Sequence, residues 1–135
     1  MIEVIKTNKG TPPGGYYSQG IKAGDFLFTA GQVAVDPKTK DIINENIEAE
    51  TRQVMKNLSA IAEAAGTSLK NTVKATVFLT DMRLFDRFNA VYAEYFPENP
   101  PARSTVQVGP LLREFHIEIE AIIYCPPEKN TQLRK

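Results

Sequence analysis

The sequence lacks most of the residues that small proteins use for covalent or metal cross-links. Its 135 residues include one Cys, one His and no Trp. A single cysteine cannot close an internal disulfide, and one Cys with one His cannot supply the four ligands of a structural zinc site. A disulfide scaffold and a zinc finger are therefore excluded, and we expect no metal and no cofactor.

The chain also lacks an excess charge and a long apolar run. Its 16 Lys and Arg balance 16 Asp and Glu. A neutral chain lacks the general attraction to phosphate on which non-specific nucleic-acid binding depends, so we expect no nucleic-acid partner. No run of about 18 apolar residues predicts a membrane span, and the first residues do not have the pattern of a signal peptide. These features favour a cytoplasmic protein with no membrane partner.

The composition is that of an ordinary globular protein. Hydrophobic residues make up 42% of the chain and charged residues 24%. The length falls within the roughly 100–200 residues of one domain. Because no linker, repeat or low-complexity block divides the sequence, we expect a single domain over residues 1–135.

Periodicity and turn residues predict the element order βββαβαββ. Asn46 is a plausible N-cap for a first helix, whose apolar stripe ends before Gly66 and whose polar face, Glu50 included, is expected to meet solvent. A second helix is expected over about residues 84–95. Strands are expected over residues 2–6, 16–21, 26–35, 71–80, 102–108 and 115–124. The fold class is therefore α+β, with two helices on one face of a mixed sheet.

Two helices leave the other sheet face without cover. Phe26, Phe28, Val73 and Val77 indicate that neither face is fully polar. An exposed, partly apolar sheet face is usually an interface. We therefore expect a homo-oligomer.

The last two predicted strands carry the most informative side chains. Strand alternation places Arg103 and Thr105 on one face of the first, and Glu118 and Glu120 on one face of the second. If the two strands pair as a hairpin, all four side chains share one face of the sheet. Arg103 then suits a clamp for a substrate carboxylate, and a Glu suits the handling of water or a proton. The alternative is a cross-strand ion pair on a solvated face.

Other reactive residue types give weaker signals. Cys125 has no basic partner nearby in the sequence, so we interpret it as a structural thiol. His116 has no second ligand at metal spacing and is interpreted as a surface or interface residue. Tyr16 and Tyr17 fit core positions as well as ligand contacts. With one histidine, a Ser-His-Asp triad is excluded.

Two motifs near the end of the chain are more specific. Pro101-Ala102-Arg103-Ser104 is followed by Ile117-Glu118-Ile119-Glu120-Ala121. On these motifs the sequence resembles the Rid (YjgF) family of reactive-intermediate deaminases over nearly its whole length. Supporting segments are residues 15–20, residues 28–32 with Asp36-Pro37, residues 73–79, and Asn89 with Tyr92.

The resemblance implies a chorismate-mutase-like two-layer fold and a homotrimer. Three sheets would form a central barrel, with three clefts at the subunit boundaries. It also implies an enzyme that hydrolyses 2-imino acids or their enamine tautomers to 2-keto acids and ammonia without a cofactor. The expected substrates are 2-iminobutanoate and 2-iminopropanoate.

The same resemblance assigns roles to particular residues. Arg103 matches the arginine that binds the substrate carboxylate, and Glu118 matches the glutamate that positions the attacking water. Tyr17 matches a tyrosine lining the cleft, Gly31 matches a backbone contact near the ligand, and Thr105 stands at a position thought to contribute backbone groups.

Two departures from the family pattern bear on substrate preference and rate. Many members carry Ser where this chain has Ala30, and many bacterial members carry Cys where it has Thr105. One alternative function is a regulatory trimer that binds 2-keto or amino acids without turnover. Another is the ribonuclease or translation-inhibitor activity attributed to some relatives, against which the zero net charge and lone histidine argue.

Overall fold

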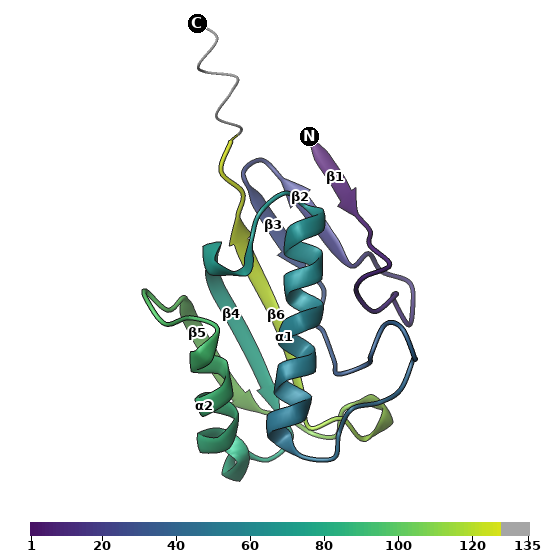
Figure 1. Ribbon diagram of the computed structural model, residues 1–135, viewed down its shortest axis with the longest axis vertical. Coiled ribbons are helices and arrows are strands. Elements are labelled where there is room, and N and C mark those ends of the chain that lie inside the picture. The colour runs from purple at the N-terminus through teal and green to yellow at the C-terminus, as the bar shows by residue number, and fades with distance from the viewer. Residues whose placement is uncertain (128–135) are drawn as a thin grey trace, which may run out of the picture.

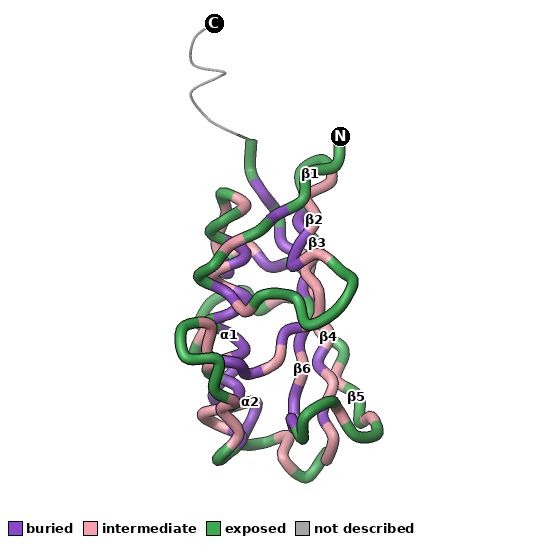
Figure 2. Tube along the Cα trace, turned by 90° about the vertical axis from the view of Figure 1, so that its right-hand side faces the viewer, coloured by how far each residue is buried: buried purple, intermediate pink, exposed green. Residues whose placement is uncertain are grey.

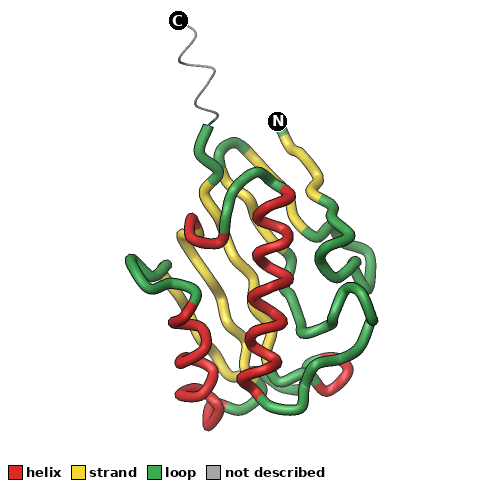
Figure 3. The backbone as a smooth tube through the Cα atoms, viewed as in Figure 1, coloured by secondary structure: helices red, strands yellow, loops and turns green. Residues whose placement is uncertain are grey.

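Six strands form one mixed sheet, and two helices lie across one of its faces (Figures 1 and 3). This computed structural model describes residues 1–127. The sequence predicts one domain over residues 1–135, and the last eight of these residues, 128–135, lie outside the described part. The predicted element order and fold class are confirmed. The helices are α1 (Ile47–Ala64) and α2 (Phe85–Glu94), and the strands are β1 (Ile2–Ile5), β2 (Gly20–Ala23), β3 (Phe26–Thr29), β4 (Thr72–Leu79), β5 (Ala102–Gln107) and β6 (Ile117–Tyr124).

The ends of α1 follow the sequence signals. The Asn46 side chain accepts a 2.7 Å hydrogen bond from the Ala49 N–H, which satisfies one of the free donors of the first turn. Beyond the helix, Gly66 has φ 84°, a left-handed conformation that glycine adopts without a steric penalty. The apolar stripe between these ends packs against the sheet through Val54, Leu58 and Ile61.

The second and third strands are shorter than expected. Residues 16–19 form a loop before β2, although the sequence predicts a strand from residue 16. After β3, the chain leaves the ladder and makes only isolated bridges, from Gln32 to Ile119 and from Val35 to Ile42. An apolar, β-branched stretch resembles a strand in sequence even where its backbone has no continuous partner. This irregular stretch contains Gly31.

The predicted hairpin of β5 with β6 is wrong. The strand order is β1-β2-β3-β6-β4-β5, with β5 parallel to β4 and β6 antiparallel to both β3 and β4. A helix between two strands favours parallel neighbours, and α2 provides that crossover between β4 and β5. Strand β4 therefore separates the two strands that carry the predicted site.

This order places the predicted site residues on opposite faces of the sheet. Arg103 lies beside Ala75 of β4, which in turn lies beside Ala121 of β6, on the face that the helices cover. Glu118 lies beside Phe78, on the other face. The predicted sharing of one face is therefore wrong, and so is the alternative of an ion pair between Arg103 and Glu120.

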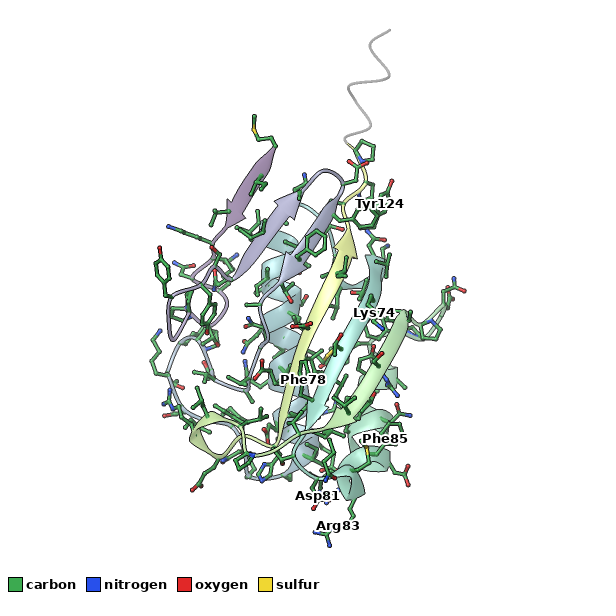
Figure 4. The ribbon with its side chains drawn as sticks, turned by 180° about the vertical axis from the view of Figure 1, so that it is seen from behind. Lys74, Phe78, Asp81, Arg83, Phe85 and Tyr124 are labelled. Carbon is green, nitrogen blue, oxygen red and sulfur yellow. The ribbon has the colours of Figure 1, made fainter. Side chains whose placement is uncertain are left out.

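The face away from the helices remains uncovered (Figures 2 and 4). Phe26, Phe28 and Val73 are exposed there, as expected, and Val106 and Tyr124 extend the apolar area. Val77 points into the core, so both faces of the sheet carry apolar residues, as the sequence indicates. Among the described residues, no helix combines the length and the apolar character that a membrane span needs.

Glu50 is buried, although its place in the first turn of α1 suggested a solvent-facing charge. Its Oε2 accepts hydrogen bonds from the backbone N–H groups of His116 (2.6 Å) and Ile117 (3.1 Å). Its Oε1 lies 2.8 Å from Nδ1 of His116. These contacts fasten the start of α1 to the start of β6, and they give His116 a structural partner.

Candidate functional site

The carboxyl group of Glu118 lies directly against the backbone of Gly31. A Cβ at residue 31 would collide with Oε2 of Glu118 and would stand 2.8 Å from its Cδ and 3.0 Å from its Cγ. Real Cβ contacts under 3.0 Å essentially never occur, so the observed position of the Glu118 carboxyl requires glycine at residue 31. The lack of a side chain at Gly31 therefore leaves the space that the Glu118 carboxyl occupies. The predicted backbone contact between Gly31 and a ligand stays a prediction.

Glu118 is a half-buried carboxyl group with an unusual environment. Burial, and to a lesser degree the charge of Glu120, raise the pKa of Glu118 above its ordinary value. Within residues 1–127, no hydrogen-bond donor or cation pairs with its side chain. A carboxyl group with a raised pKa and no fixed partner is suited to taking up and returning a proton.

A cavity of about 970 Å³ opens beside Glu118. Its walls bring together segments that are distant in the chain: the loop before β2, the irregular stretch after β3, and the connection from β5 to β6. Two of the predicted site residues, Tyr17 and Gly31, line it together with Glu118. The Tyr17 hydroxyl accepts a 3.0 Å hydrogen bond from the N–H of Gly14, which holds the loop at the rim.

Arg103 occupies a separate position between β5 and α2. Its Nη1 donates a 2.8 Å hydrogen bond to Oδ1 of Asn89. The guanidinium carbon lies 5.4 Å from the ring centre of Phe85, 5.3 Å from that of Phe88 and 4.7 Å from that of Tyr92. Such distances are those of cation–π contacts.

The guanidinium of Arg103 is held in place but has no anionic partner. In the described part of the chain, no carboxylate lies within 4.0 Å of it. Nearby, the buried hydroxyls of Thr105 and Tyr92 also have no hydrogen-bond partner among the described residues. An unpaired, oriented arginine beside unused hydroxyls is suited to binding a carboxylate.

The predicted site residues therefore form two groups. Tyr17, Gly31 and Glu118 share the cavity, whereas Arg103 and Thr105 lie on the helix-covered side of the edge strand β5. One copy of the chain does not bring the two groups together. We refer to them as the glutamate half-site and the arginine half-site.

Asn89 and Tyr92 support the family resemblance, but nothing in the sequence connects them, or Phe85 and Phe88, with the orientation of Arg103. The aromatic spacing of Phe85, Phe88 and Tyr92 along α2 was visible, but it fits a core stripe equally well. Asn89 lies one turn from Phe85, on the side that faces β5. Knowing that α2 crosses between β4 and β5 would have placed this helix face beside Arg103.

Most of the described chain, from β2 to β6, matches a known family. Residues 8–125 match the family described as Endoribonuclease L-PSP. A RutC family protein of Pyrococcus horikoshii is 54% identical over 124 residues, which cover 92% of this chain and 98% of that protein. A protein of Arabidopsis thaliana named Reactive Intermediate Deaminase A, chloroplastic, is 42% identical over 120 residues, covering 89% of this chain and 64% of that protein.

A solved structure agrees with these sequence matches. The crystal structure of E. coli TdcF with bound serine superimposes with a TM-score of 0.86 at 35% identity. The match covers 92% of this chain and 99% of TdcF.

Proposed function

This chain belongs to the Endoribonuclease L-PSP family, which also contains the RutC and Rid proteins, and we propose that it hydrolyses 2-imino acids or their enamine tautomers. The proposed products are 2-keto acids and ammonia, with 2-iminobutanoate and 2-iminopropanoate as substrates. A relative named as a reactive intermediate deaminase supports the reaction class, and the serine bound by TdcF supports a small ligand with a carboxylate.

One observation carries this proposal. Arg103 and Glu118, the two charged groups that such a reaction needs, are each free of an ionic partner within residues 1–127 and lie on opposite faces of the sheet. A structural ion pair would have joined them or given each another partner. Their separation is explained if the arginine half-site of one copy meets the glutamate half-site of the next.

We therefore propose a homotrimer with the active site at each subunit boundary. The uncovered sheet face supplies apolar surface for association, through Phe26, Phe28 and Val73. The arginine half-site lies on β5, an edge strand whose outer side has no partner within the described chain. Repeating one heterologous contact around a closed ring gives every copy the same cleft.

In the proposed reaction, the Arg103 guanidinium binds the substrate carboxylate through two charge-assisted hydrogen bonds. The ionised carboxylate of Glu118 takes a proton from water as the water oxygen bonds to the iminium carbon, and the electrons of the C=N double bond move to nitrogen. Glu118 then returns the proton to that nitrogen. The C–N bond breaks with its electron pair on nitrogen, and the hydroxyl left on carbon gives its proton to the Glu118 carboxylate. The products are a 2-keto acid and ammonia.

No nucleophilic side chain is required, because the iminium carbon is already electrophilic. Fixing the carboxylate and the water relative to that carbon supplies most of the expected acceleration. The raised pKa of Glu118 makes its carboxylate a stronger base once it is ionised. The carboxyl still has to be ionised to accept the proton.

The test is a coupled assay. An amino-acid oxidase or a dehydratase generates 2-iminopropanoate or 2-iminobutanoate in the cuvette, and keto-acid formation is timed with and without the protein. We expect faster formation with the wild type and none above background with Arg103→Ala. Calorimetry with 2-ketobutyrate should show affinity at least roughly 10- to 100-fold weaker for that variant, because a bidentate charged contact is lost.

Two further variants and measurements distinguish the alternatives. Arg103→Lys should restore only part of the activity, because an ammonium keeps the charge but not the two-pronged geometry. Wild-type protein that binds 2-ketobutyrate but does not accelerate hydrolysis would instead be the regulatory binder. The family description raises RNA cleavage as a second candidate, and incubation with single-stranded RNA tests it directly.

A further inference from the structure

We propose that the Thr11 hydroxyl positions Tyr17 for substrate binding, because it attaches the loop that carries Tyr17 to α1 and to the stretch after β3. Thr11 is then a positioning residue of the proposed reaction, and it acts through Tyr17 instead of contacting the substrate. This inference rests on the proposed function, since it takes Tyr17, which lines the Glu118 cavity, as a substrate contact.

Backbone hydrogen bonds contribute little to the position of the loop before β2. Among the described residues, the only such bond that involves residues 7–18 joins the Tyr17 N–H to the Gly15 carbonyl, at 3.0 Å. Pro12 and Pro13 have no N–H to donate. The loop therefore depends on side chains to hold it against the rest of the protein.

The buried side chain of Gln19 fixes the internal shape of this loop. Its Oε1 accepts a 2.8 Å hydrogen bond from the Thr7 N–H, and its Nε2 donates to the carbonyls of Thr7 (3.1 Å) and Thr11 (2.8 Å). The Tyr17 hydroxyl accepts from the Gly14 N–H within the same loop. All of these bonds join residues 7–19 to one another, so they do not attach the loop to α1 or to the stretch after β3.

The Thr11 hydroxyl makes that attachment. It donates a 2.8 Å hydrogen bond to the carbonyl of Val35, and it accepts a 3.0 Å hydrogen bond from Nδ2 of Asn57 on α1. Asn57 is buried, and the same Nδ2 also donates to the carbonyls of Val33 and Val35. Within the described chain, no other hydrogen bond joins residues 7–18 to α1 or to the stretch after β3.

These bonds leave the Thr11 hydroxyl little capacity to bind a substrate, although Thr11 lines the Glu118 cavity. A hydroxyl has one proton, and this one is directed at the Val35 carbonyl. One of its acceptor positions is filled by Asn57. An effect of the hydroxyl on substrate binding should therefore act through the loop, whose predicted substrate contact is Tyr17.

Thr67 provides a matched control for the competing explanation, which is that Thr11 only stabilises the fold. The Thr67 hydroxyl donates a 2.7 Å hydrogen bond to the carbonyl of Tyr124 and accepts a 3.0 Å hydrogen bond from Nδ2 of Asn71. Thr67 follows α1 and does not line the cavity. Thr67→Val therefore removes the same pair of hydrogen bonds as Thr11→Val does, at a place away from the site.

The experiment measures the affinity for 2-ketobutyrate by calorimetry, together with kcat and KM for 2-iminobutanoate. Two hydrogen bonds between neutral groups shift an equilibrium by roughly 10- to 100-fold, and affinity falls with the share of molecules that keep the loop in place. Thr11→Val should weaken affinity and raise KM about tenfold, while kcat stays within about threefold because Arg103 and Glu118 lie on strands. Thr11→Ser, which keeps the hydroxyl, and Thr67→Val should each stay within about threefold of wild-type affinity.

A double-variant cycle shows whether Thr11 acts through Tyr17. Tyr17→Ala alone should weaken affinity, and adding Thr11→Val to it should change affinity less than about twofold, because the contact that Thr11 positions is already lost. Chymotrypsin gives a readout that needs no ligand. It should cleave after Tyr16 or Tyr17 about tenfold faster in Thr11→Val than in the wild type, and at the wild-type rate in Thr67→Val.

The outcomes that overturn the inference differ from those that overturn the proposed function. Wild-type affinity in Thr11→Val, in a protein that hydrolyses imines, would overturn the inference alone. Equal losses in Thr11→Val and Thr67→Val would reduce Thr11 to a stabilising residue, and a full further loss in the Tyr17→Ala background would show that it does not act through Tyr17. A wild type that binds 2-ketobutyrate without hydrolysing imines would refute the proposed reaction, and the affinity series would still decide the role of Thr11.

Discussion

At the scale of single residues, the glutamate half-site depends on a missing side chain. The Glu118 carboxyl occupies the space in which a Cβ of residue 31 would lie. The φ of Gly31 lies outside the left-handed region, so alanine is compatible with its backbone. Substitution there should therefore act on the position of Glu118 rather than on the fold.

Gly31→Ala should lower imine hydrolysis about as strongly as removing the Glu118 carboxylate does, while thermal stability changes little. Gly109→Ala provides the matched control, because a Cβ at residue 109 meets no atom within 4 Å. The measurement is kcat for 2-iminopropanoate, together with a thermal melt of each variant. Full activity in Gly31→Ala would show that hydrolysis does not need the observed position of Glu118.

Replacing each glutamate of β6 in turn tests which of the two is the general base. Glu118→Gln should slow hydrolysis about 10²- to 10⁴-fold, the range expected for loss of a general base, while affinity for 2-ketobutyrate is kept. Glu120→Gln should slow it much less. Equal losses in the two variants, or the reverse order, would mean that Glu118 is not the base.

The pH profile gives a second readout. Burial and the Glu120 charge raise the pKa of Glu118, so wild-type activity should fall on acidification at a pH above the ordinary pKa of a glutamate. Glu120→Gln removes a like charge, which lowers the pKa of Glu118 and shifts the acid limb of kcat/KM to lower pH. A limb that moves to higher pH, or does not move, contradicts this assignment.

At the scale of elements, the contact between α1 and β6 depends on Glu50. Its carboxylate accepts hydrogen bonds from the backbone N–H groups of His116 and Ile117, the two residues immediately before Glu118. Glu50→Ala would leave both donors buried without a partner, at about 1–3 kcal/mol each. We expect urea unfolding to show a loss of about 2–5 kcal/mol.

The matched control is Glu48→Ala on the same turn of α1. Glu48 forms an exposed ion pair with Arg87, and such pairs contribute little to stability. Glu48→Ala should therefore lower the free energy of unfolding much less than Glu50→Ala does. Comparable losses in the two variants would mean that the Glu50 contacts do not stabilise the junction.

The sequence predicts the elements better than their neighbours in the sheet. Alternation along β5 correctly placed Arg103 and Thr105 on one face, and helical periodicity with the cap at Asn46 located α1. The alternation of side chains along a strand does not identify its neighbour in the sheet. The predicted hairpin of β5 with β6 therefore overlooked the crossover that α2 makes between β4 and β5. The sequence also did not predict the burial of Glu50, because a glutamate in the first turn of a helix usually faces solvent.

At the scale of the whole molecule, the uncovered sheet face should decide assembly. Light scattering should give about 45 kDa, three times the 15.0 kDa chain. Phe28→Glu places a charge at the centre of this face and should lower the measured mass toward that of one chain, with loss of hydrolysis. Ala93→Glu, on the exposed side of α2, should leave the trimer intact. A wild-type mass near 15 kDa would exclude any site shared between chains.

The most direct test of a shared site is complementation between two inactive variants. Arg103→Ala and Glu118→Gln are each purified, shown to be inactive, mixed in equal amounts, and unfolded and refolded together so that chains exchange. If each cleft takes Arg103 from one chain and Glu118 from its neighbour, about one cleft in four receives both intact residues in a random mixture. The account predicts recovery of about a quarter of wild-type activity. A mixture that assembles into mixed trimers and stays as inactive as its components would contradict it.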